Sequence, residues 1–442
     1  MTKILLITVG GSHQPIATSI QSLQPNRTIF ICSGGQRGSI SQVTGDGKPC
    51  EVRRGAEVLE RLPNIPTQLG LSDFDPDRDV VLLKNPDDLS EGYQKISEKV
   101  REIQAAATTA ELVADYTGGT KTMSVALATV ALDYDLRVYI TTAQRTNLIK
   151  VERGERVRRA TVTGLTIQRV LEQDLPRFLG QYNYPAAIAA LEVLLRDTES
   201  ADLGSVEAHL NFCVGLDLWD RFDHGEAWGY LEPFLSQPST KDLVLFLKRV
   251  IGSRQFIAPA VDDRFEGKNG IKGHGYEIVQ DLLFNAERRA SQQRFDDAVA
   301  RLYRAIELLG QVRLWQEYQI KTGDLELEML PKALRGRYGA RRNNRNGKIQ
   351  IGLIPSYELL RELSDEPLGE LYGEYKDRLL NKLQFRNFSI LAHGMNPVTH
   401  AEYGDFWESL GEFMQQGIGR LTAGSSFSAS QFPRRLSLPL SF

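Results

Sequence analysis

The sequence predicts an α/β domain at the N-terminus followed by an all-α region. In residues 1–165, short apolar runs rich in β-branched residues alternate with helical patterns, and this alternation is typical of a doubly wound parallel sheet. After residue 165, helical periodicity replaces the strand-like runs. With 442 residues, of which 25% are charged, the chain has the composition of an ordinary globular protein of two or three domains.

The first expected strand is the continuous apolar run Ile4–Val9, and the turn 10–15 leads from it into a helix over 16–23. Ligands bind beyond the carboxyl ends of the strands in such sheets. The glycine-rich turns at 10–15 and 117–121 both follow strands, so we expect them to share one binding face. Further strands are expected over 28–32, 80–83, 111–114, 137–141 and 148–151, with a helix over 123–133.

The second half divides by composition. Helices are expected over 175–190, 208–220, 241–251, 276–290 and 299–314. Residues 262–275 are polar and contain four glycines, which predicts a boundary between a helical connector over 166–275 and a separate helical domain over 276–420. Residues 421–442 are rich in serine, and we expect them to form a disordered tail.

The most informative motif is Asp115–Thr122, which reads Asp-Tyr-Thr-Gly-Gly-Thr-Lys-Thr. Glycine lets the backbone approach a ligand closely. The start of the following helix offers free N–H groups and a positive dipole end, and Lys121 adds a point charge. The turn therefore predicts a cradle for the phosphate of a nucleotide or oligonucleotide. The alternative is a turn whose glycines serve packing alone. The P-loop pattern does not fit, because Thr120 and Asp115 stand where it needs glycine.

Composition limits the partners. The net charge is −3, so nucleic acid would have to bind a local basic patch. Residues 335–348 hold six basic residues and no acidic one, and they either contact RNA phosphates or form a solvated loop. Three scattered cysteines indicate a reducing compartment and offer no metal spacing. No apolar run reaches the ~20 residues of a membrane span, so we expect a cytoplasmic protein.

A second candidate site lies near the C-terminus. Arg386 and His393 are seven residues apart, which places both on one stripe of a helix expected to run from about residue 371 to a stop at Gly394. Metal-free RNA cleavage needs a proton-transfer group of near-neutral pKa and a fixed positive charge. Two turns separate the pair by about 10 Å, and a two-fold dimer would bring two pairs together. The alternative is a surface arginine and a helix-end histidine.

These motifs resemble those of a known family. Thr117–Ser124 resembles the second ligand-binding motif of CARF domains, which are Rossmann-like, and Gly10–Pro15 looks like their first. Arg386-Asn387 with His393 resembles the Arg-x4–6-His motif of HEPN ribonucleases, and residues 297–311 look like an early HEPN helix. This order is that of the Csm- and Csx-type effectors of type III CRISPR systems. The resemblance covers 1–165 and 276–420, and residues 166–275 match no pattern.

The resemblance implies that a paired CARF domain binds a cyclic oligoadenylate, such as the tetra- or hexa-adenylate. Binding would activate a HEPN homodimer that cuts single-stranded RNA without a metal cofactor, leaving a 2′,3′-cyclic phosphate, in antiviral defence. The alternatives are a regulator with an inactive HEPN scaffold, a CARF pocket that degrades its ligand, and an α/β domain that binds an unrelated nucleotide. The implied ligand-pocket residues are Gly10, Gly11, Ser12, His13, Thr117, Gly118, Gly119, Thr120, Lys121 and Thr122. The implied nuclease residues are Arg386, Asn387 and His393.

Overall fold

The structure is a computed structural model with two compact units, Met1–Thr166 and Ile167–Phe442. Within the described ranges, no helix is long and apolar enough to cross a membrane. The residues described are 2–35, 38–54, 57–106, 109–142, 156–160, 163–197, 204–258, 270–386, 389–391, 394–436 and 438.

The first unit is built on a six-stranded sheet in the order β5-β2-β1-β6-β7-β8. Neighbouring strands pair in parallel except β7 and β8, which are antiparallel. The chain moves outward from β1 to β5 and then returns to β6, so the direction of winding reverses between β1 and β6. The predicted doubly wound parallel sheet is confirmed. Its strands are β1 (Lys3–Thr8), β2 (Arg27–Ser33), β5 (Val80–Leu83), β6 (Glu111–Asp115), β7 (Arg137–Thr142) and β8 (Arg156–Arg159).

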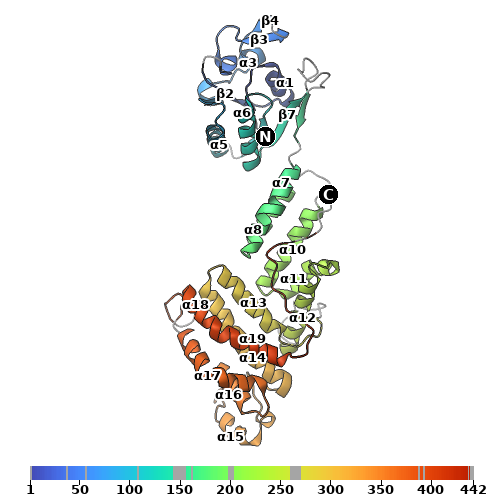
Figure 1. Ribbon diagram of the computed structural model, residues 1–442, viewed down its shortest axis with the longest axis vertical. Coiled ribbons are helices and arrows are strands. Elements are labelled where there is room, and N and C mark those ends of the chain that lie inside the picture. The colour runs from blue at the N-terminus through green and yellow to red at the C-terminus, as the bar shows by residue number, and fades with distance from the viewer. Residues whose placement is uncertain are drawn as a thin grey trace. The chain divides into compact units, whose positions relative to one another are not determined.

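Helices cover both faces of this sheet (Figure 1). Side chains of β1 alternate between the two cores: Leu5 and Ile7 pack with α1, while Ile4 and Leu6 pack with α5 and α6. Burial on both faces explains why β1 is a continuous apolar run. The helices of this unit are α1 (Gln14–Leu23), α2 (Ser41–Thr44), α3 (Ile65–Leu69), α4 (Pro76–Asp79), α5 (Leu89–Ala106) and α6 (Lys121–Asp133).

Three strands of this unit differ from the sequence prediction. The strand expected over 148–151 lies outside the described residues, and the antiparallel edge strand is β8. A separate antiparallel hairpin joins β3 (Cys50–Arg54) and β4 (Glu57–Leu62). Both β4 and β8 are mainly exposed, so neither carries the continuous apolar pattern by which buried strands are recognised.

The second unit is all-α in its described part, as predicted. A single core cluster extends from Leu171 to Leu438. The expected connector and the expected C-terminal helical domain therefore share one core. The elements are α7 (Thr163–Arg169), η1 (Val170–Asp174), α8 (Leu175–Gly180), α9 (Tyr184–Asp197), α10 (Gly204–Asp220), α11 (His224–Leu231), η2 (Glu232–Ser236), α12 (Lys241–Ile257), α13 (Glu277–Ser291), α14 (Phe295–Tyr318), η4 (Leu327–Met329), α15 (Lys332–Gly339), α16 (Leu353–Glu362), α17 (Pro367–Arg386), α18 (His400–Phe406), η5 (Trp407–Gly411) and α19 (Glu412–Leu421).

Of the boundary expected over 262–275, the structure describes residues 270–275, which pack closely on α12; residues 262–269 lie outside the described residues. The Ile271 N–H donates to the Lys248 carbonyl oxygen at 3.2 Å. A Cβ atom on Gly270 would lie 2.0 Å from the Gly252 nitrogen. Glycine is needed at position 270 because two backbones meet there. These contacts are those of a packed segment, and not those of a linker between domains.

The C-terminal segment also differs from the expected disordered tail. Phe432 is 3% exposed, and its ring centre lies 4.7 Å from that of Trp219. The Gln431 side chain donates to the Phe284 carbonyl oxygen at 3.1 Å. Residues 427–434 are called the C-terminal strap below. One buried aromatic and its hydrogen-bonded neighbour order a segment whose serine content predicted disorder.

The helix expected to carry Arg386 and His393 together is shorter than predicted. Helix α17 ends at Arg386, and Ser389 instead forms a β-bridge with Asn396. The Ile390 N–H donates to the Asn396 carbonyl oxygen at 3.0 Å, so this backbone finds its partner outside a helix. The continuous helix expected from about residue 371 to Gly394 is therefore interrupted at Ser389.

Candidate functional site

The two glycine-rich turns meet where the winding of the sheet reverses. Strands β1 and β6 are neighbours, with Ile7 opposite Asp115, so both turns leave the same sheet edge. A Cβ atom on Gly10 would lie 2.6 Å from the Gly119 nitrogen, and one on Gly118 would lie 2.2 Å from the Thr8 carbonyl oxygen. Glycine is therefore required at both positions, because the two turns touch through their backbones.

A buried carboxylate holds the second turn in place. Asp115 is fully buried, and its Oδ1 accepts hydrogen bonds from the Thr117 N–H (2.8 Å) and the Thr117 hydroxyl. Its Oδ2 accepts from Ser19 Oγ (2.7 Å) and Thr141 Oγ1 (3.2 Å). The Thr117 hydroxyl in turn accepts from the Thr141 N–H at 2.7 Å. Strands β6 and β7 and helix α1 therefore fix the turn together, while Tyr116, which follows Asp115, is partly buried against the core.

The turn then reverses direction into helix α6. The Gly118 carbonyl oxygen accepts from Thr8 Oγ1 at 2.7 Å and Ser124 Oγ at 3.0 Å. Gly119 has a φ of +82°, which favours glycine. Thr120 is the N-cap of α6: its hydroxyl accepts from the Met123 N–H and donates to the Pro86 carbonyl oxygen. The helix start is thus held by two segments outside α6, at Thr8 and at Pro86.

The open side of this arrangement is suited to an anion. Gly11, Ser12 and Lys121 are exposed, and a Cβ on Gly11 would meet nothing within 4 Å. Lys121 is the first residue of the 13-residue helix α6, whose first-turn N–H groups have no acceptor inside the helix. The positive end of the helix dipole and the lysine charge therefore coincide at this edge.

His13 behaves differently from its exposed neighbours. It precedes α1, and its side chain is 3% exposed. Burial lowers the pKa of the imidazole below its usual 6.5, because an apolar surrounding disfavours the charged form. His13 therefore shapes the turn as a neutral side chain.

The structure brings the predicted ligand residues of the two turns to one sheet edge. Sequence reasoning missed the groups that hold them, because they come from several elements. The missed supports are Thr8, Ser19, Asp115, Ser124 and Thr141. The one available signal was Asp115, a carboxylate at the end of an apolar strand.

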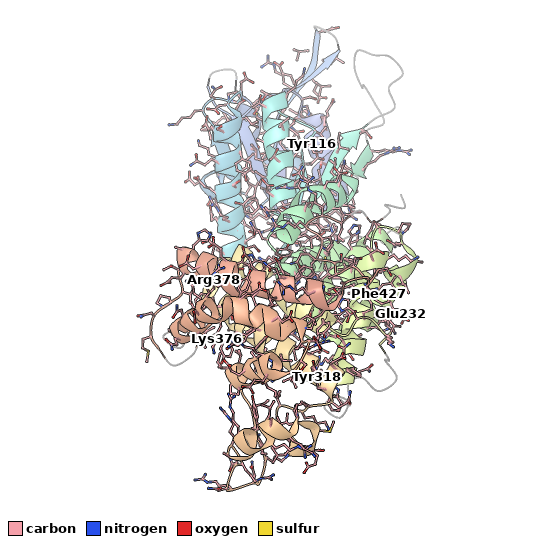
Figure 2. The ribbon with its side chains drawn as sticks, turned by 60° about the horizontal axis from the view of Figure 1, so that its bottom comes forward. Tyr116, Glu232, Tyr318, Lys376, Arg378 and Phe427 are labelled. Atoms are coloured by element: carbon pink, nitrogen blue, oxygen red, sulfur yellow. The ribbon has the colours of Figure 1, made fainter. Side chains whose placement is uncertain are left out.

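The predicted nuclease residues are less completely described. Arg386 is the last residue of α17, and the structure describes its backbone; Asn387 and His393 lie outside the described residues. Helix α17 itself is well held: Lys376 pairs with Glu358 of α16 at 2.7 Å, and Arg378 donates to the Glu408 carbonyl oxygen at 3.3 Å (Figure 2).

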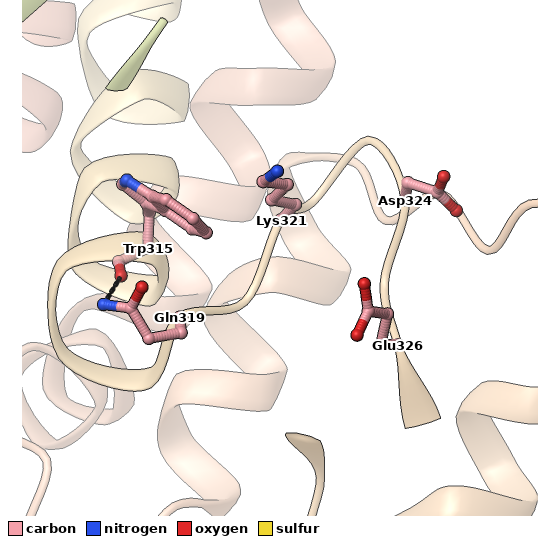
Figure 3. A pocket seen from close by; sticks show the side chains of 5 residues that line it. All are labelled: Trp315, Gln319, Lys321, Asp324 and Glu326. Atoms are coloured by element: carbon pink, nitrogen blue, oxygen red, sulfur yellow. Dashed lines mark hydrogen bonds between the residues drawn. The ribbon is translucent and has the colours of Figure 1, made fainter. Parts of the chain in front are cut away.

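A pocket of about 200 Å³ in the helical unit is lined by Trp315, Gln319, Lys321, Asp324 and Glu326 (Figure 3). Lys321 Nζ lies 5.0 Å from the centre of the Trp315 ring. Of the two carboxylates in this lining, Asp324 also pairs with Lys348 at 3.1 Å. Within the described ranges, no three His, Cys, Asp or Glu side chains are grouped as metal ligands would be.

The fold and the candidate site define a class: an α/β domain with an exposed lysine and a helix start at its switch point, followed by a unit that is all-α in its described part. Comparisons make this more specific. Residues 268–416 match the family model of the Csm6 HEPN domain. The whole fold is similar to that of Enterococcus italicus Csm6 bound to cyclic hexa-2′-fluoro-hexa-dAMP, with a TM-score of 0.55, 11% identity and 95% of each chain covered. No curated protein matches the sequence. The first finding shows a stretch similar to a HEPN domain within the helical unit, and the second shows that the fold resembles that of Csm6.

Proposed function

We propose that this chain is an RNA endonuclease that a cyclic oligoadenylate activates, acting in the cytoplasm in type III CRISPR antiviral defence. The observation that carries the proposal is the meeting of the two glycine-rich turns beside Lys121 and the start of α6, in a chain whose helical unit matches a HEPN model. A sensor pocket and a nuclease unit on one chain are the two parts that such regulation requires.

The ligand assignment rests on chemistry and on the fold. The open edge offers backbone N–H groups, a helix dipole and one lysine, which suit a phosphodiester better than an apolar ligand. The similar Csm6 structure holds a cyclic oligonucleotide. A symmetric ring has identical faces for two identical domains, so a homodimer would complete the pocket.

The nuclease assignment gives each residue a role. Arg386 would stabilise the charge that develops on the phosphate as the ribose 2′-hydroxyl attacks it. His393 would transfer the proton, and Asn387 would orient the phosphate. Because the nucleophile belongs to the RNA, this route needs no metal and leaves a 2′,3′-cyclic phosphate.

The first experiment measures cleavage of a fluorescent single-stranded RNA in excess EDTA with cyclic tri-, tetra- or hexa-adenylate. We expect one of these three cyclic oligoadenylates to activate RNA cleavage by the wild type. His393→Ala should fold, bind that ring and leave the RNA intact, whereas His400→Ala, an exposed histidine at the start of α18, should cut like wild type. A wild type that cuts no RNA with any ring refutes the nuclease, and cleavage that EDTA abolishes refutes the metal-free route.

The second experiment tests the pocket. Lys121→Ala should weaken ring binding by about 10- to 100-fold, because a hydrogen bond to a charged group contributes about 1.5–3 kcal/mol. Lys95→Ala on α5, whose ammonium contacts Glu91 and the Leu82 carbonyl oxygen, serves as the control. If the two variants bind the ring with equal affinity, the ligand does not bind at Lys121. Consumption of the ring by an Arg386→Ala, His393→Ala variant would favour a pocket that degrades its ligand.

A further inference from the structure

A basic hairpin projects from the helical unit between α15 and α16. It comprises residues 341–349 and closes through a bridge between Arg342 and Ile349. Figure 1 shows α15 at the bottom of this unit, with α16 and α17 between it and α18. Helix α15, which precedes the hairpin, is joined to the end of α16 by an ion pair between Arg337 and Glu362.

Hydrogen bonds hold this hairpin in a defined shape. The Asn343 N–H donates to the Lys348 carbonyl oxygen at 2.9 Å, and the Gly347 N–H donates to the Asn343 carbonyl oxygen at 2.8 Å. Gly347 has a φ of +72°, which suits a tight turn. The Arg345 N–H donates to Asn343 Oδ1 at 2.8 Å. The segment is therefore an exposed turn of defined shape.

The hairpin concentrates positive charge on a chain whose net charge is −3. Residues 331–350 contain seven basic residues and no acidic one. Two of the seven meet carboxylates from other segments: Arg337 with Glu362, and Lys348 with Asp324 at 3.1 Å. The fold thus supplies few anions to match these cations.

Two arginines of the hairpin differ from its other basic residues in their contacts. Arg341 and Arg345 are exposed, and their side chains form no hydrogen bond or ion pair with the described residues. Arg342 is also exposed but donates to the Gly347 carbonyl oxygen at 2.6 Å, which directs it to the turn. Arg341 and Arg345 are therefore the guanidinium groups available for an external anion.

We propose that the basic hairpin binds the phosphate backbone of the single-stranded RNA substrate at a point away from the cutting residues; this rests on the proposed nuclease function. Guanidinium groups fit phosphate through two parallel hydrogen bonds. Exposed asparagine side chains between them add contacts to phosphate and sugar. The hairpin tip offers no aromatic side chain for stacking, so the contact holds RNA without reading its sequence.

The binding test uses the full chain and a fluorescent RNA with 2′-O-methyl groups, which lacks the attacking hydroxyl. Arg341→Ala, Arg345→Ala is compared with Arg177→Ala, Arg221→Ala, which removes two exposed arginines from surface pairs with Asp174 and Asp217. Each lost phosphate contact lowers the slope of log K against log salt by about 0.7 for a single strand. We expect a slope smaller by about 1.4 and on the order of tenfold weaker binding at low salt.

The cleavage test separates this surface from the cutting site. With long RNA, the hairpin variant should show a raised KM and an unchanged kcat. RNA too short to reach the hairpin from the cutting site should be cut at the wild-type rate. Affinity and salt slope equal to those of the control variant would overturn the proposal. A wild type that binds RNA through the hairpin but never cuts would instead overturn the proposed function alone.

Discussion

Asp115→Ala tests whether the buried carboxylate builds the candidate ligand turn. Four hydrogen bonds from Ser19, Thr117 and Thr141 end on Asp115. Alanine leaves four donors without this acceptor: Ser19 Oγ, the Thr117 N–H, the Thr117 hydroxyl and Thr141 Oγ1. Each unsatisfied buried donor costs about 1–3 kcal/mol. We therefore expect the N-terminal unit to lose about 3 kcal/mol or more of its free energy of unfolding, and its affinity for the ring.

Asp115→Asn is the matched control. The remaining amide oxygen can accept both hydrogen bonds from Thr117. The amide nitrogen can donate its two hydrogens to the hydroxyls of Ser19 and Thr141, which accept as readily as they donate. The shape and the number of hydrogen bonds are kept, so we expect a loss of about 1 kcal/mol or less.

The assay is urea unfolding of the full chain with two readouts. All four tryptophans lie beyond residue 166, so tryptophan fluorescence follows the helical unit alone. Hydrogen exchange of peptides from 1–35 and 109–142 follows the α/β unit. If Asp115→Asn is as unstable as Asp115→Ala, the charge of Asp115 matters and its hydrogen-bond pattern does not. If the α/β unit of Asp115→Ala unfolds at the same urea concentration as that of the wild type, the hydrogen bonds to Asp115 do not hold the turn.

Two further substitutions test one unit each: His13→Asn the α/β unit, and Phe432→Ala the helical unit. Because burial lowers the pKa of His13 below 6.5, the folded α/β unit binds a proton less readily than the unfolded chain; its stability should be complete above pH 6.5 and fall as the pH drops below that value. His13→Asn should remove this decline, seen by far-ultraviolet circular dichroism during urea unfolding at pH 7.5 and 5.5, and an identical decline in the variant would exclude His13 as its source. Phe432→Ala should cost the helical unit about 3–5 kcal/mol, because the Phe432 ring lies 3.7 Å from the Arg288 guanidinium carbon and 4.7 Å from the Trp219 ring. Phe427→Ala, at a position that is 45% exposed, should cost less than about 1 kcal/mol, and equal fluorescence midpoints for the two variants would contradict the assigned packing.

The parallel sheet was predictable because strands buried on both faces must be apolar throughout, as β1 is. The hairpin of β3 and β4 was not, because an exposed strand needs no such pattern. Nor was the end of α17 at Arg386, since helix limits depend on local hydrogen bonds such as the one from Ile390 to Asn396.

The candidate site divides in the same way. Glycines between a strand and a helix were visible in the sequence because the backbone requirement is local. The role of Asp115 was not, because its partners Ser19 and Thr141 lie 96 and 26 residues away. The C-terminal strap was hidden for a similar reason: Phe432 orders a serine-rich segment only because Trp219 and Arg288 meet it.

The C-terminal strap also affects when the helical unit can fold. Arg434 donates to the Tyr182 hydroxyl, a contact between residues 252 positions apart, and Phe432 packs on Tyr184 at 5.9 Å. Contacts of such separation form late in folding. During synthesis, this core stays open until the C-terminal strap has left the ribosome. A chain cut short in the strap therefore keeps its α/β unit but has a helical unit whose core is incomplete.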